Sequence, residues 1–131
     1  MLCPCIVVAE SLIMLSIKGH FLKSAVVSTP KQRQQGLSKR REFPANFDAM
    51  LFVYSTDESL SFWMKETYFP LTIAFIDARK KIVDLIDMQP LTTVEHQSSQ
   101  PVRYALEVSL GWFVAHDVNI GDVVQFTLPE S

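Results

Sequence analysis

The sequence predicts a single α+β domain that is mostly β, with one antiparallel, barrel-like sheet and two short helices. Three observations lead to this fold class. The chain has 131 residues, the length of one ordinary domain. About seven or eight short segments of strand length are separated by turn residues. No strands alternate with long helices, as a doubly wound parallel sheet would require.

Strand-length segments that are apolar or alternating run through the whole chain. The predicted strands are residues 12–18, 21–28, 50–54, 60–65, 72–77, 81–88, 103–109 and 123–128. Between the sixth and seventh of them, residues 89–101 form the longest predicted loop, bounded by two prolines. We assign residues 1–19 to an N-terminal extension that includes a candidate first strand, and residues 20–128 to the single domain.

The first predicted helix has a clear start signal. Thr29 can cap it, Pro30 suits the first helical position, and Gln32 completes a capping-box pattern. We expect this helix to end near Gly36. A second short helix is predicted within residues 111–118.

Composition and charge exclude several classes of protein. Apolar residues make up 48% and charged residues 20%, which is typical of a globular chain. The net charge of −2 gives no general attraction to nucleic acid, and we expect no nucleic-acid partner. Basic residues concentrate in KQRQQGLSKRR, residues 31–41, which indicates a solvated helix face or, alternatively, an anion or partner site.

The N-terminal segment bears on localisation. Residues 1–17 are apolar, but Glu10 interrupts them and no cation precedes Lys18, unlike a secretory signal. The segment is also too short to span a bilayer. We favour a cytoplasmic protein with no stable membrane span, and periplasmic export is the alternative. Cys3 and Cys5 are too close for an unstrained disulfide, so we expect free thiols.

Strand alternation sorts the side chains of two segments that carry charge among apolar residues. In residues 60–65, one set of alternating side chains is predicted to face the core: Leu60, Phe62 and Met64. The other set is predicted to face away from it: Ser61, Trp63 and Lys65. In residues 103–109, one set points to one face of the strand: Tyr104, Leu106 and Val108. The other set points to the opposite face: Arg103, Ala105 and Glu107.

Six blocks fall in order along the chain: GLSKR (36–40), MLFVY (50–54), FWMKET (62–67), PLTIAFID (70–77), RYALEVSLGW (103–112) and IGDVVQF (120–126). Together they resemble one family, the domain of unknown function 192. The resemblance implies a compact, mostly β domain of bacteria and archaea, often with a secretion signal, and no established activity. Glu66 stands where the family usually has asparagine, and Thr72 where it usually has aspartate, so a polar site using those residues would be altered here.

Glu107 lies mid-strand between apolar neighbours, an expensive place for an unpaired carboxylate. We expect a structural ion pair with Lys65 or Arg103. The alternative is a general acid or base with a raised pKa.

These residues favour a non-catalytic module that binds an anionic small molecule or a peptide. The candidate ligand-binding residues are Trp63, Lys65, Thr67, Arg103, Glu107, Arg33 and Arg40. One alternative is a hydrolase or transferase that uses Glu107 as acid or base, so whether the protein is an enzyme stays open. The other is partner docking through the basic helix, residues 30–41. No cofactor or metal is expected, because the three histidines lack metal-ligand spacing and no phosphate-binding loop is present.

Overall fold

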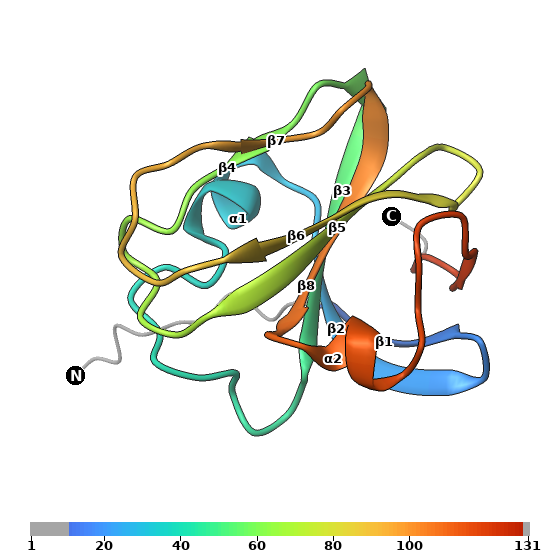
Figure 1. Ribbon diagram of the computed structural model, residues 1–131, viewed down its shortest axis with the longest axis horizontal. Helices are drawn as coiled ribbons and strands as arrows, with labels where there is room; N and C mark the ends of the chain where they lie inside the picture. Colours follow the sequence, from blue (N-terminus) through green and yellow to red (C-terminus); the bar gives the residue numbers. More distant parts are fainter. Residues whose placement is uncertain (1–10, 130–131) are drawn as a thin grey trace.

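The computed structural model describes residues 11–129 and confirms the predicted mostly β fold with two short helices (Figure 1). The strands are β1 Ser11–Ile17, β2 His20–Val27, β3 Ala49–Glu58, β4 Ser61–Phe62, β5 Leu71–Ile76, β6 Ile82–Met88, β7 His96–Gln97, β8 Val102–Ser109 and β9 Val124–Gln125. The helices are α1 Pro30–Gln35 and α2 Trp112–Ala115. Predictions for residues 1–10, including the two cysteines, lie outside the described residues.

Seven strands form the main sheet, in the order β6-β5-β8-β3-β2-β1-β9. Its neighbours are antiparallel except β2 and β3, which run parallel from the pair Ser24↔Ala49 to the pair Val27↔Phe52. The connection between these two strands contains α1, because parallel neighbours need a crossover. Strands β4 and β7 form a separate two-stranded ribbon.

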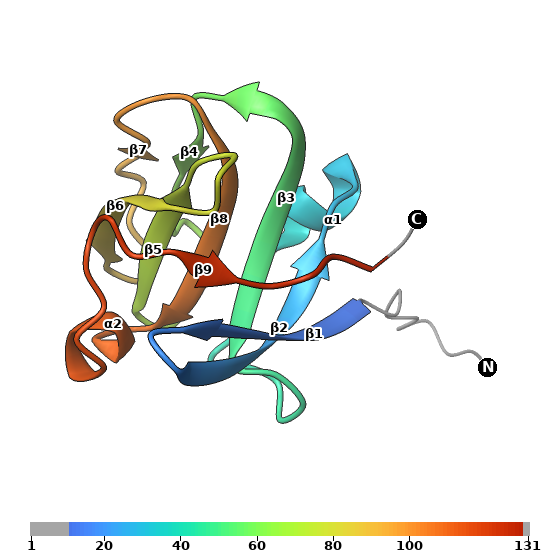
Figure 2. The same ribbon diagram turned by 90° about the vertical axis from the view of Figure 1, so that its right-hand side faces the viewer.

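The sheet curls until its two edges meet at one end, which gives the barrel-like shape (Figure 2). The amide of Val124 donates to the carbonyl of Lys80 at 2.8 Å, and the amide of Ile82 donates to the carbonyl of Asp122 at 2.9 Å. These bonds join the segment that leads into β6 to the segment that leads into β9. Where the two sheet edges are paired in this way, a strand of another chain cannot add to them.

Both faces of the sheet are buried, against two separate clusters of apolar side chains. The inner cluster, enclosed by the curled sheet, includes Leu15, Leu51, Ala74, Ile76, Leu106, Val108 and Phe113 of α2. The outer cluster includes Leu37, Met50, Phe52, Met64, Ile73, Phe75 and Ala105. Alternate residues of β5 enter different clusters, so all six are buried and the strand reads as a continuous apolar run.

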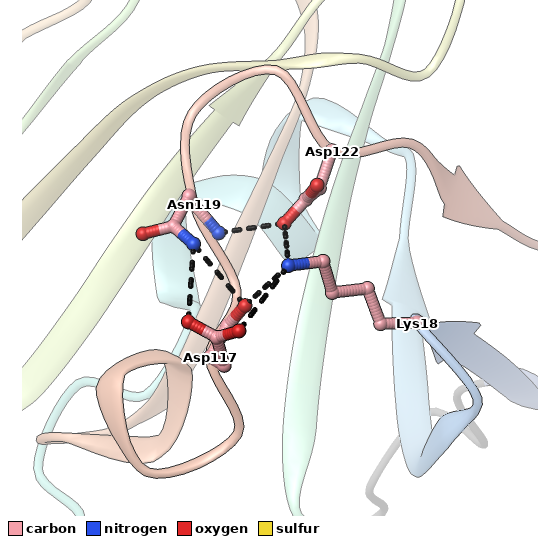
Figure 3. A network of polar contacts seen from close by, with 4 residues as sticks. All are labelled: Lys18, Asp117, Asn119 and Asp122. Carbon is pink, nitrogen blue, oxygen red and sulfur yellow. Dashed lines mark hydrogen bonds and ion pairs between the residues drawn. The ribbon is translucent and has the colours of Figure 1, made fainter.

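A polar network fixes the turn before β9 to the β1–β2 hairpin (Figure 3). The Nζ of Lys18 donates to the carbonyl of Asp117 at 2.7 Å and lies 3.5 Å from a carboxylate oxygen of Asp122. The amide of Asn119 donates to the same Asp122 oxygen at 2.7 Å. Lys18 therefore holds the loop that carries the chain into β9.

Four predicted element boundaries were wrong. The strand predicted over 50–54 continues to Glu58. The strand predicted over 60–65 ends at Phe62, because the chain turns at Met64, whose carbonyl accepts from the Thr67 amide at 3.2 Å. The predicted loop 89–101 contains β7, which pairs with β4. The strand predicted over 123–128 is reduced to β9. Within residues 11–129, no helix is long and apolar enough to cross a membrane.

Candidate functional site

A pocket of about 460 Å³ opens on the outer face of the sheet, between the C-terminal end of α1 and the segment 61–67. In Figure 1, α1 lies beside the β4–β7 ribbon, away from α2. The pocket is lined by Arg33, Gln34, Gln35, Gly36, Leu37, Ser38, Phe52, Tyr54, Ser61, Phe62, Trp63, Lys65, Glu66, Thr67 and Glu107. Its volume is typical of small-molecule sites.

The helical wall of the pocket is fixed by its cap and by one glycine. As predicted, Thr29 and Gln32 form a capping box: the Gln32 amide donates to Thr29 Oγ1 at 3.1 Å, and the Thr29 amide donates to Gln32 Oε1 at 3.2 Å. Gly36 ends the helix at φ +44°, and a Cβ there would lie 3.3 Å from the Phe52 ring. Only glycine allows the backbone to turn this close to the ring.

The opposite wall is held by backbone hydrogen bonds on two sides. The amide of Lys39 donates to the carbonyl of Glu66 at 2.6 Å, which joins the chain after α1 to this wall. On its other side, the amide of Met64 donates to the carbonyl of Thr92 at 3.1 Å, and the amide of Leu91 donates to the carbonyl of Thr67 at 3.1 Å. The wall is therefore positioned by main-chain contacts, so its side chains remain available to line the pocket.

Glu107 of β8 lines the pocket from the sheet and is 5% exposed. Its neighbours across the sheet are Met50 on β3 and Ile73 on β5, both fully buried. No hydrogen bond or ion pair from any residue within 11–129 reaches its carboxyl group. Burial alone therefore raises the pKa of Glu107 from 4.5 to about 8, so the carboxyl is mostly protonated at neutral pH.

The guanidinium group of Arg33 in α1 is held by contacts within the protein. Its Nη1 donates to the carbonyls of Ser28 and, at 3.1 Å, Val53. Its guanidinium carbon lies 4.4 Å from the centre of the Tyr54 ring. Burial raises the pKa of the Tyr54 phenol, whereas the nearby Arg33 charge lowers it. Arg33 thus fixes Tyr54 in the wall of the pocket.

Trp63 and Lys65 form the exposed rim. Trp63 is 53% exposed, and the Nζ of Lys65 lies 5.4 Å from the centre of its ring. Both are exposed and Met64 between them is buried, as the sequence predicted, although the strand itself ends at Phe62. Because Lys65 makes no ion pair within the described part of the chain, its charge is open to solvent or a ligand.

The structure brings together five of the seven predicted site residues. Those lining the pocket are Arg33, Trp63, Lys65, Thr67 and Glu107, whereas Arg40 and Arg103 do not line it.

The ion pair predicted for Glu107 was wrong. Arg103 lies four residues away on the same face, about 13 Å along the strand, and its Nε donates to Asp57 at 3.0 Å instead.

Sequence reasoning missed the aromatic part of the pocket. Phe52 and Phe62 fall at apolar positions of predicted strands and read as core, and Tyr54 ends an apolar run. All three nevertheless line the pocket. Gly36 signalled in the sequence that the helix ends there. The aromatic side chain that it meets, Phe52, is distant in sequence.

Within residues 11–129, the pocket thus combines a buried carboxyl group that has no partner, four aromatic rings and, at its rim, a lysine that makes no ion pair. Within the described residues, no group of three His, Cys, Asp or Glu side chains is arranged to hold a metal ion. The arrangement can hold a small molecule, donate a hydrogen bond from Glu107, or exchange a proton with it.

Fold and site together define a mostly β, barrel-like domain with a ligand-sized pocket on the outer face of its sheet. The chain belongs to the family DUF192, described as Uncharacterized ACR, COG1430, whose family model matches residues 13–126. The resemblance found in the sequence is therefore confirmed. A comparison with curated proteins gave no match.

Two solved structures share the fold. One is the crystal structure of a candidate transcription regulator from Sinorhizobium meliloti 1021, with a TM-score of 0.85 and 28% identity over 92% of this chain and 97% of that chain. The other is a protein of unknown function from Novosphingobium aromaticivorans DSM 12444, with a TM-score of 0.83 and 22% identity over 92% and 89% of the two chains. These similarities establish the fold and leave the activity of this chain open.

Proposed function

We propose that this protein is a non-catalytic module that binds a small molecule, or the end of a peptide, in the pocket between α1 and segment 61–67. The ligand carries an anionic group that meets Lys65 at the rim. The observation that carries the proposal is the buried carboxyl group of Glu107, which opens into a pocket of ligand size without a partner within residues 11–129. A carboxyl group that faces a pocket without a protein partner can be satisfied by a ligand that bonds to it.

The lining supports binding of an amphipathic molecule. Aromatic walls offer contact area to an apolar body, and few polar groups fix its orientation, as is usual in ligand sites. The positive charge of Lys65 lies next to Trp63, where it can attract an anionic head group from solvent.

A thermal-shift screen of small carboxylates, phosphates and acidic peptides tests this proposal. Ligands of the pocket should raise the melting temperature of the wild type, and Lys65→Ala should reduce that shift. Lys31→Ala removes an equal charge from an exposed position outside the pocket and should leave the shift unchanged. Equal shifts in both variants would remove Lys65 from the site.

An enzyme that uses Glu107 as general acid or base is the second candidate. A carboxyl group with a pKa of about 8 in a pocket is suited to proton transfer near neutral pH. Turnover of a test substrate should then change with an apparent pKa near 8. Glu107→Gln keeps the shape of the side chain and should abolish turnover while the protein stays folded, as judged by circular dichroism; a variant that retains turnover excludes this candidate.

A further inference from the structure

Glu107 has an unusual set of neighbours for a group at the base of a pocket. Across the sheet it meets only the apolar side chains of Met50 and Ile73. The titratable and charged groups that share the pocket with it are Arg33, Tyr54, Lys65 and Glu66. Arg33 is bound to two backbone carbonyls and Lys65 lies over Trp63, so neither neutralises the Glu107 carboxyl group.

Four aromatic rings line the same pocket, those of Phe52, Tyr54, Phe62 and Trp63. The faces of two of these rings are already occupied within the protein, since Arg33 lies over Tyr54 and Lys65 lies over Trp63. The rings therefore supply contact area for an apolar ligand body, and the Glu107 carboxyl group decides which charge the base of the pocket accepts. An ionised Glu107 would repel an anion there, whereas a cation would pair with it, so the base of the pocket favours positive charge.

We propose that the ligand carries a cationic amine that pairs with the carboxylate of Glu107 at the base of the pocket. This inference rests on the proposed function, because it concerns the same pocket and adds a second group to the same ligand. With an anionic group at Lys65 and an amine at Glu107, the ligand is a zwitterion with an apolar body, the chemistry of an apolar amino acid.

Binding of the amine displaces a proton. The protonated carboxyl group loses its proton to solvent, and the ammonium group keeps its own and pairs with the resulting carboxylate. With a pKa of about 8, the empty pocket holds about 0.9 proton on Glu107 at pH 7, and nearly all of it is released on binding. Affinity for the amine should therefore rise about tenfold between pH 6 and pH 7, about fivefold between pH 7 and pH 8, and level off above that.

Three probes that share a phenyl group and carry different charged groups test the inference: 2-phenylethylamine, phenylacetate and phenylalanine. Calorimetric titration in two buffers of different ionisation enthalpy measures the protons released. We expect 2-phenylethylamine and phenylalanine to bind with release of close to one proton at pH 7. Phenylalanine should bind more tightly because it also meets Lys65.

Two matched variants locate the effect. Glu107→Gln keeps the shape of the side chain but cannot ionise, so it should weaken binding of both amines at least tenfold and abolish proton release. Glu42→Gln removes an acid from an exposed position outside the pocket and should change neither quantity. Amine binding that is unchanged in Glu107→Gln would overturn the inference.

The outcome also separates this inference from the proposed function. If phenylacetate binds in a Lys65-dependent way while the amines do not, the pocket binds ligands but Glu107 does not recognise an amine, and only the inference is overturned. If none of the three probes binds at millimolar concentration, the inference is overturned as well. The screen of carboxylates, phosphates and acidic peptides then decides the proposed function separately.

Discussion

The Glu107 carboxyl group should make the protein less stable as the pH rises. Its pKa is 4.5 in the unfolded chain and about 8 in the folded protein, where burial disfavours the charge. Between these values the folded state binds more protons than the unfolded state, so the free energy of unfolding falls as protons are removed. The stability associated with this group is therefore fully present below about pH 4.5 and is progressively lost up to about pH 8.

The size of this effect follows from the two pKa values. Each pH unit inside the window costs about 1.4 kcal/mol. Relative to low pH, the loss is about 1 kcal/mol at pH 5, about 3 kcal/mol at pH 7 and about 5 kcal/mol at pH 9. Domains of this kind are typically stable by only about 5–15 kcal/mol, so the effect is large enough to measure.

Glu107→Gln removes the titration while keeping the shape of the side chain. Its stability relative to the wild type should therefore rise by about 4 kcal/mol between pH 5 and pH 9. Urea denaturation at several pH values, followed by tryptophan fluorescence, measures both proteins. Glu66→Gln, an exposed acid on the rim, serves as the control and should run parallel to the wild type. If the curves of the wild type and Glu107→Gln are also parallel, the carboxyl group is not buried without a partner, and the reasoning is refuted.

Two further substitutions test how the fold is held. Gly36→Ala should destabilise the protein by about 2 kcal/mol, because it combines a backbone cost with a contact against the Phe52 ring; Gly19→Ala, which has positive φ but open space around it, should lose only about 1 kcal/mol. Equal losses in urea denaturation would show that the ring contact is unimportant. Lys18→Met should cost about 1 kcal/mol at low ionic strength and less in 1 M salt, since its ion pair with Asp122 is partly exposed; a loss that does not depend on salt would contradict this account.

Local signals in the sequence predicted the local structure well. The capping box at Thr29 and the alternation around Met64 depend on residues within a few positions of one another, and both are confirmed. The short strand β7 was missed because its pairing with β4 joins segments about 35 residues apart, and nothing within the loop itself shows this partner.

The candidate site was predicted only in part, for a related reason. Alternation could place Glu107 and Lys65 away from one apolar face, but it could not show that the other face is covered by a second apolar cluster. Because this second face was taken to be open, the sequence suggested that a cation could reach the Glu107 carboxyl group. In the structure, Arg103 pairs with Asp57 at the far end of the strand instead. Phe52, Tyr54 and Phe62 were missed because their rings pack in or against the outer apolar cluster and also line the pocket.

The meeting of β1 with β9 sets an order of events during synthesis. Ser16 and Gln125 are paired across 109 positions of sequence, so the edge of β1 stays unpaired until almost all of the described chain has left the ribosome. At roughly 5–20 residues per second, that delay lasts about 5–20 s. For that time the nascent chain carries an open strand edge, and a chaperone or a neighbouring nascent chain can reach it before β9 does.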